Sequence, residues 1–132
     1  MPLTYEIDHD RRLVVATPDG VLTDAEIFQY QLEVWSRPDV QGYDEFIDMT
    51  NVSEVEFVST NRVFELAKLS ESMDPPLSPS KLAILATSEV HFGLARMYEA
   101  YRESGRQNTK VPRVFRARAE ALKWLGVSGE AP

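Results

Sequence analysis

The chain has 132 residues, of which 43% are hydrophobic and 27% charged, and it carries a formal net charge of -7. This composition predicts one globular domain over residues 1–127, followed by a loose tail at 128–132. The absence of cysteine excludes disulfides, thiol nucleophiles and thiolate metal sites, and the acidic charge argues against binding to nucleic acid phosphates.

Two strands are predicted at the N-terminus. Hydrophobic and polar residues alternate over 4–9, and the run 13–16 is continuously apolar. Segments this close should pair as a hairpin. Residues 17–20 are turn formers that end it. The N-terminus lacks a signal-peptide pattern and no apolar run is long enough to span a membrane, so we expect a cytoplasmic protein.

A capping box from Thr23 to Glu26 opens the first predicted helix, which should end near Arg37 because Pro38 cannot continue it. Apolar residues follow more than one line along this helix, and one sheet face covers only one of them. The apolar side chains that the sheet leaves uncovered are expected to form a symmetric homodimer contact. One line holds Phe28, Leu32 and Trp35, and the candidates for the dimer contact are Ile27, Tyr30 and Val34.

The middle of the chain predicts a strand, a loop and a helix. The strand at 45–49 contains Asp48 near its end, and 52–58 is expected to be a connecting loop. Ser59 or Thr60 can cap the second helix with its hydroxyl. The proline-rich segment 74–80 is a stiff connection that no helix crosses. The apolar side of the helix includes Val63, Leu66, Ala67, Ser70 and Met73.

The unbroken apolar run 82–86 is typical of a strand that is buried on both faces. Residues 87–89 supply a helix cap and an acid for the first turn. The third helix should bury one line of side chains, which contains Val90, Leu94, Met97, Tyr98 and Tyr101. His91 is expected either to cap the helix or to face solvent, and Gly93 suggests close approach of another backbone or a ligand.

The C-terminal part predicts a loop over 105–110, a strand at 111–115 and a short helix at 117–125, with Gly126 as its cap. Trp124 should anchor this helix beside Phe115, so that Trp124→Ala costs about 3–5 kcal/mol. The whole order, β-β-α-β-α-β-α-β-α, predicts an α/β domain with a mixed, mostly parallel sheet flanked by helices.

Three segments resemble the SpoIIAA-like branch of the STAS (sulfate transporter and anti-sigma factor antagonist) superfamily, found mainly as small bacterial proteins. They are FIDMTNV at 46–52, FGLARMYE at 92–99, and VFR at 114–116 with EALKWL at 120–125. The resemblance covers nearly the whole chain. It implies a mixed sheet flanked by helices, similar to the lipid-binding SEC14/CRAL-TRIO arrangement, and no enzymatic activity or cofactor.

The resemblance also directs attention to the start of the second helix. Antagonists of the STAS type carry a phosphorylatable Ser in an Asp-Ser pair at this place. Here Ser59 and Thr60 supply the hydroxyls, but no Asp directly precedes either one. They are therefore either phospho-acceptors of a regulatory switch or plain helix caps.

Other candidates for chemistry are few. His9 lies between Asp8 and Asp10, but neighbours on one strand diverge, so no metal site is expected. Asp48 ends a parallel strand, so it either marks the place where ligand sites of α/β proteins usually open or caps the next loop. Phe92 lies off the apolar line of its helix, so this ligand-binding candidate is expected to point to solvent, into a groove or towards a partner. No phosphate loop or nucleophile elbow is present, so no catalytic residue is expected.

The charge is unevenly distributed. Residues 1–89 contain six basic and seventeen acidic residues, whereas 90–125 contain eight basic and three acidic ones. This pattern indicates either solvated faces or contact with an anionic ligand, an acidic partner or a lipid headgroup. Two functions follow as hypotheses. One is a regulatory module that binds a protein partner around Ser59. The other is a carrier of a small amphipathic ligand, at a membrane surface in one version, with its anionic head near Arg96 or Arg102.

Overall fold

The main sheet of the computed structural model, which describes residues 3–104 and 109–127, has five strands in the order β1-β2-β4-β6-β7. β1 (Leu3–Asp8) and β2 (Leu13–Pro18) form the expected antiparallel hairpin. β4 (Asp44–Asp48), β6 (Ser80–Leu85) and β7 (Lys110–Phe115) then add in parallel. The mixed, mostly parallel sheet is confirmed. The expected tail at 128–132 and most of the expected loop at 105–110 lie outside the described residues.

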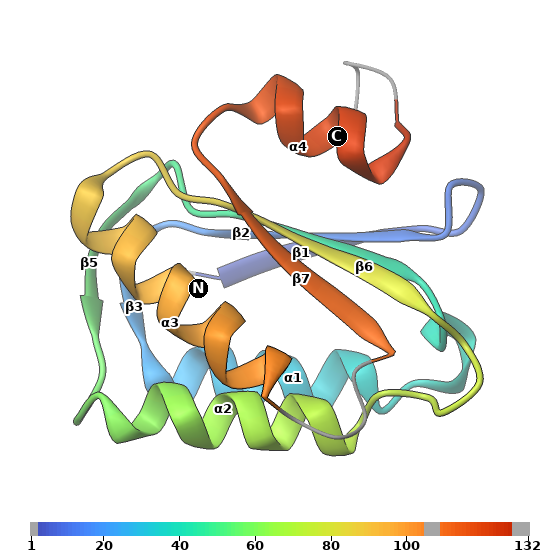
Figure 1. The fold of residues 1–132 in the computed structure, drawn as a ribbon, viewed down its shortest axis with the longest axis horizontal. Coiled ribbons are helices and arrows are strands. Elements are labelled where there is room, and N and C mark those ends of the chain that lie inside the picture. The colour runs from blue at the N-terminus through green and yellow to red at the C-terminus, as the bar shows by residue number, and fades with distance from the viewer. Residues whose placement is uncertain (1–2, 105–108, 128–132) are drawn as a thin grey trace.

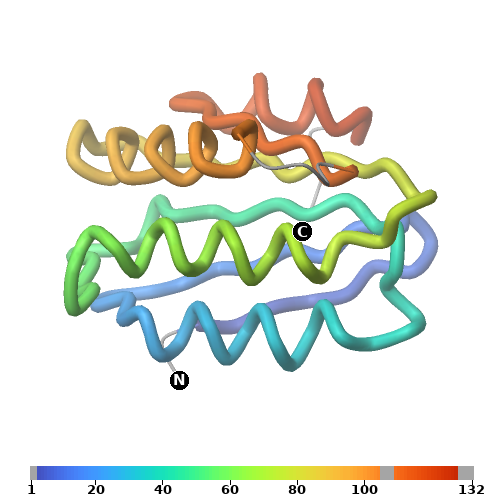
Figure 2. Tube along the Cα trace, turned by 60° about the horizontal axis from the view of Figure 1, so that its bottom comes forward, coloured from blue at the N-terminus to red at the C-terminus, as the bar shows by residue number. Residues whose placement is uncertain are grey.

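Helices cover both faces of this sheet (Figure 1). α1 (Asp24–Trp35), α2 (Asn61–Ser72) and α3 (Glu89–Glu103) lie on one face, and Figure 2 shows them running side by side. α4 (Arg118–Leu125) lies alone on the other face, and a 3-10 turn, η1 (Pro38–Val40), follows α1. No helix in the described part of the chain combines the length and apolar character needed to cross a membrane.

A second, two-stranded sheet was not expected. β3 (Gly20–Thr23) pairs in parallel with β5 (Val52–Glu56), where the sequence suggested a turn and a connecting loop. Gly20 N–H donates to the carbonyl of Asn51 at 3.0 Å, which starts the pairing. The prediction was wrong here because each strand is short and its partner lies about thirty residues away, so neither gives a strong local signal.

Local capping explains most of the helix ends. Thr23 and Glu26 form both bonds of the capping box, Ser88 Oγ accepts from the His91 N–H, and Gly126 ends α4 with φ of 79°. The second helix differs from the expectation. Thr60 occupies its N-cap position with φ of -64° and ψ of -23°, and its side chain makes no capping bond. Because that backbone is already helical, the hydroxyl is not directed at the free N–H groups.

The core lies on both faces of the sheet, and β6 is buried on both, as predicted: Leu82, Ala83, Ile84, Leu85 and Ala86 are all at most 5% exposed. The helix α1 buries the line that was assigned to a dimer contact. Ile27, Tyr30 and Val34 are buried within the chain, so they offer no surface to a second copy. Leu32 is instead 52% exposed.

Two expectations for α3 are also wrong. Val90 is 70% exposed, whereas His91 is buried. The buried line therefore runs through His91, Ala95 and Arg102 rather than through Val90. The helix packs mainly against α2 and β7. These tertiary contacts decide which side of α3 faces inward.

Replacing Gly93 should stabilise the protein. A Cβ at this exposed position in α3 would meet nothing within 4 Å, so no close approach requires glycine there. We expect Gly93→Ala to raise the free energy of unfolding by about 0.5–1 kcal/mol, because alanine loses less backbone entropy in a helix. Urea melts measure this. Gly126→Ala, at positive φ, is the contrasting control and should destabilise. A loss of stability in Gly93→Ala would contradict the prediction.

Candidate functional site

An apolar cavity of about 90 Å³ lies between the helices and the main sheet. Ile47, Leu82 and Ile84 line it from the sheet side. Each of the three helices on this face contributes to the opposite wall, and both strands of the small sheet close one side. The helix residues include Ile27 of α1, Leu66 of α2 and Ala95 of α3. Every element on this face therefore shapes the cavity.

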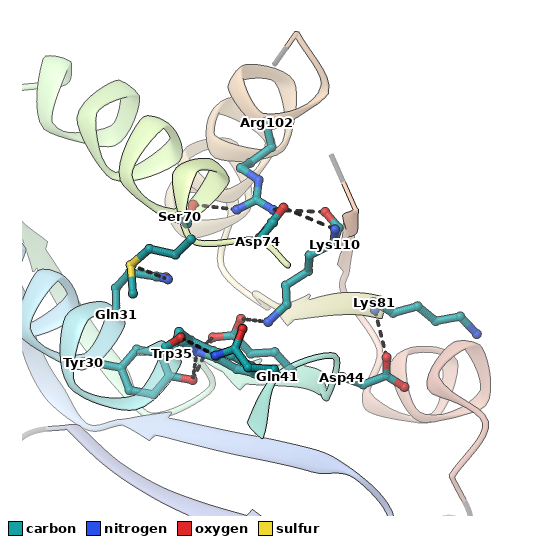
Figure 3. A network of polar contacts seen from close by, with 12 residues as sticks. Tyr30, Gln31, Trp35, Gln41, Asp44, Ser70, Asp74, Lys81, Arg102 and Lys110 are labelled. Atoms are coloured by element: carbon teal, nitrogen blue, oxygen red, sulfur yellow. Dashed lines mark hydrogen bonds and ion pairs between the residues drawn. The ribbon is translucent and has the colours of Figure 1, made fainter. Parts of the chain in front are cut away.

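Polar side chains lie at one part of the cavity wall, and they belong to a hydrogen-bonded group (Figure 3). Tyr30 Oη donates to Glu45 Oε2 at 2.7 Å. Trp35 Nε1 lies 3.2 Å from the same carboxylate oxygen and 3.2 Å from Tyr30 Oη. Burial first, and then the charge of Glu45, raise the pKa of the Tyr30 hydroxyl well above its ordinary value. Tyr30 therefore stays protonated and acts as a donor.

Lys110, at the start of β7, neutralises Glu45. Its Nζ lies 3.2 Å from Glu45 Oε1 and 3.1 Å from the centre of the Trp35 ring. Burial lowers the pKa of Lys110, and the carboxylate of Glu45 opposes this effect. A buried ammonium needs both the counter-charge and the aromatic face to offset its lost hydration.

A second buried ion pair lies next to the first (Figure 3). Arg102, only 1% exposed, pairs with Asp74 at 2.6 Å. Its guanidinium also donates to Ser70 Oγ at 2.6 Å and to the Lys110 carbonyl at 3.1 Å. Burial raises the pKa of Asp74 against the opposing charge of Arg102. The pair thus joins the end of α2, α3 and β7, and the expectation that Arg102 faces a ligand headgroup is wrong.

The other ligand candidates make separate contacts. Asp48 Oδ1 accepts from the Thr50 N–H at 3.0 Å, and its Oδ2 accepts from Arg118 Nη1 at 2.5 Å. Phe92 is half-buried, and the Arg116 guanidinium lies 3.8 Å from its ring centre. Asp48 therefore stabilises the turn that follows β4 and links the start of α4 to the end of that strand, while Phe92 packs beneath an arginine. Arg96 is 63% exposed at its side chain and pairs with Glu99 at 3.0 Å.

The segment that carries Ser59 and Thr60 is held by the first turn of α1. Asp24 Oδ2 accepts from the Val58 N–H at 3.2 Å and from Arg62 Nε at 3.0 Å. Ser59 and Thr60 are exposed. The carboxylate of Asp24 therefore positions the loop, and the two hydroxyls lie at the surface. The Thr60 side chain does not cap α2.

The contacts of Asp24 predict a pH dependence of stability. The hydrogen bond from Val58 first, and then Arg62, lower the pKa of Asp24. A carboxyl whose folded pKa is depressed stabilises the fold above its ordinary pKa of about 4, and this contribution is lost as pH falls through the folded value. In urea melts from pH 7 down to about pH 2, Asp24→Asn should lose less stability on acidification than the wild type. Asp10→Asn, on an exposed turn, is the control, and equal acid slopes for Asp24→Asn and wild type would contradict the prediction.

His9 has a structural partner. Its Nδ1 lies 2.8 Å from Tyr43 Oη, and its Nε2 lies 3.8 Å from Asp39. Within residues 3–104 and 109–127, no group of three or more His, Asp or Glu side chains is arranged to hold a metal ion.

Sequence reasoning missed the polar residues beside the cavity. Glu45 lies in a strand for which no burial was predicted, whereas Gln31 lies in the middle of the apolar side of α1. A polar residue at such a position was a usable signal, because buried polar groups need partners. Lys110 gave no such signal, since it was assigned to a loop, sixty-five residues from Glu45.

No protein-family model matches the sequence, and no curated protein sequence does either. Among solved structures, the fold is similar to that of an uncharacterised DUF3478 family protein with a SpoIIAA-like fold from Shewanella loihica PV-4. The TM-score is 0.59 at 16% sequence identity, and the match covers 93% of each chain. Similarity to the SEC14 arrangement stays a prediction. The chain therefore has a SpoIIAA-like fold, as its sequence predicts.

Proposed function

We propose that this protein is a non-enzymatic binding module that holds a small apolar or amphipathic molecule between its helices and its main sheet. The observation that carries the proposal is the cavity of about 90 Å³. Well-packed domains contain few voids larger than a water molecule. Predominantly apolar walls with a few placed polar groups are typical of small-molecule sites.

The size of the cavity limits the ligand. An engineered apolar cavity of about 150 Å³ binds benzene or xenon, so the cavity here suits a molecule of only a few heavy atoms. Met49 lines the wall and can adapt its shape, because methionine side chains are flexible. A long lipid chain would need the helices to separate, and its anionic head could not use Arg102, which is paired with Asp74.

Xenon binding followed by NMR of the side-chain methyl groups tests the proposal. We expect xenon to shift the methyl signals of Ile47, Leu82 and Ile84, and native mass spectrometry of gently purified protein to show a retained small molecule. Ala95→Leu should fill the cavity and abolish both effects, whereas Ala100→Leu, exposed on the same helix, should preserve them. Unshifted methyl signals under xenon, with no retained molecule, would overturn the proposal.

A second candidate function is binding of a protein partner through residues 58–61. It is favoured by Val58, which is 86% exposed beside the two exposed hydroxyls. A phosphate on Ser59 or Thr60 would meet the nearby carboxylate of Asp24 and would compete with it for Arg62. Phosphorylation would thereby loosen the loop from α1.

Intact mass measurements on protein from its native host, with and without phosphatase, test this switch. We expect a phosphorylated form that is lost in Ser59→Ala or Thr60→Ala, and an affinity-purified partner that is lost in Val58→Ser. Glu54→Ser, on the exposed side of β5, is the surface control. A single unmodified mass, together with unchanged partners for all three variants, would contradict the second function.

A further inference from the structure

Gln31 is a polar residue on the buried side of α1, between Ile27 and Val34. It is 8% exposed. Within the part of the chain that the structure describes, its amide makes one hydrogen bond, from Nε2 to Sδ of Met73 at 3.6 Å. An amide has two N–H donors and a carbonyl acceptor, and a thioether is a weak acceptor. Among the described residues, the amide oxygen and the second N–H of Gln31 therefore have no protein partner.

The position of Gln31 makes this capacity available to a ligand. Gln31 lines both the apolar cavity and a smaller one beside it, which has room for about one water molecule. The neighbouring polar side chains are already engaged. Tyr30 donates to Glu45, and Tyr98 Oη lies 2.7 Å from Ser70 Oγ and 3.3 Å from Arg102 Nη1.

The charges around Gln31 cancel in pairs. Glu45 lies beside Lys110, and Asp74 beside Arg102, and all four side chains are at most 7% exposed. A charged group that entered the cavity would lose its hydration without meeting an unpaired counter-charge. A neutral group that can both donate and accept a hydrogen bond could bond to the remaining N–H and the carbonyl oxygen of the amide. It would not have to lose the hydration of a charge.

We infer that Gln31 selects an uncharged hydroxyl group on the bound molecule, so that the cavity takes small neutral alcohols in preference to carboxylates. The apolar part of the alcohol occupies the space bounded by Leu82, Ile84 and Ala95, and its hydroxyl bonds to the Gln31 amide. This inference rests on the proposed function, because it names the ligand class of the same cavity.

The test compares three probes at pH 7 by titration of the methyl NMR signals: 1-butanol, butanoate and xenon. We expect 1-butanol to bind wild type more tightly than butanoate does. Gln31→Leu, which keeps a similar volume, should weaken 1-butanol by about 5- to 10-fold, as expected for one lost hydrogen bond, and should leave xenon binding unchanged or stronger. Gln29→Leu, exposed on the same helix, is the matched control.

The outcomes distinguish a failure of hydroxyl selection by Gln31 from a failure of the proposed ligand binding. If xenon and 1-butanol both leave wild-type signals unmoved, the proposed function itself fails. If xenon binds while butanoate equals 1-butanol, or while Gln31→Leu keeps the affinity for 1-butanol, the cavity binds ligands but the selection of a hydroxyl is overturned. Should Gln31→Leu not fold, Gln31→Met provides the same comparison with a flexible apolar side chain.

Discussion

Arg102→Met should lower the free energy of unfolding by about 3–5 kcal/mol, the range for breaking a buried ion pair. The guanidinium is 1% exposed and bonds to Asp74, to Ser70 and to the carbonyl of Lys110. Removing it leaves the Asp74 carboxylate buried without its counter-charge. It also unlinks α3 from the end of α2 and from β7.

Denaturant melts at pH 7 measure this loss, and two further variants locate its origin. The double variant Asp74→Asn with Arg102→Met should recover part of the stability, because an amide costs less to bury than an unpaired carboxylate. Arg96→Met, exposed on the same helix, should change stability by less than about 0.5 kcal/mol. If Arg102→Met unfolds at the wild-type urea concentration, the buried pair does not hold these elements together.

Leu122→Ala should cost about 2–5 kcal/mol, as is usual for a buried leucine. Leu122 is 3% exposed and belongs with Ala121 and Leu125 to a buried apolar cluster that includes Phe46 and residues of β2 and β6. α4 is too short to be stable alone, so these contacts hold it on the sheet.

The neighbouring Trp124 should matter less than the sequence suggests. Its ring lies 5.6 Å from that of Phe115, as expected, but it is only half-buried. We therefore expect Trp124→Ala to cost less than Leu122→Ala, and Lys123→Ala, which is exposed, to cost least. Urea melts of the three variants give the order. A larger loss for Trp124→Ala than for Leu122→Ala would show that the aromatic contact is the main anchor.

The main sheet and its helices were predictable because their signals are local. The capping box at Thr23, the helix cap at Ser88 and the glycine at 126 each act within a few residues, and the apolar run of β6 needs only its own composition. The stop at Pro38 follows from the missing N–H. Such signals define where elements begin and end.

The candidate site was not predictable in the same way, because its residues meet only after folding. Glu45 and Lys110 are far apart in the chain, as are Asp74 and Arg102, and exposed ion pairs have the same sequence pattern as buried ones. The direction in which α3 packs is likewise a tertiary property, which is why Arg102 was expected near a ligand headgroup. Gln31 alone carried a local signal, as a polar residue on an apolar helix side.

The position of β7 at the end of the main sheet has a consequence for self-association. An edge strand with free N–H groups can template pairing with another copy. Thr109 and Phe115 turn their carbonyls towards β6, where Ser80 and Ala86 donate to them. Because backbone direction alternates along a strand, Pro112 turns its nitrogen to the side away from β6, where it has no hydrogen to donate. At β7 the row of outward N–H donors is therefore interrupted at Pro112, which disfavours pairing of this edge with a strand of a second copy.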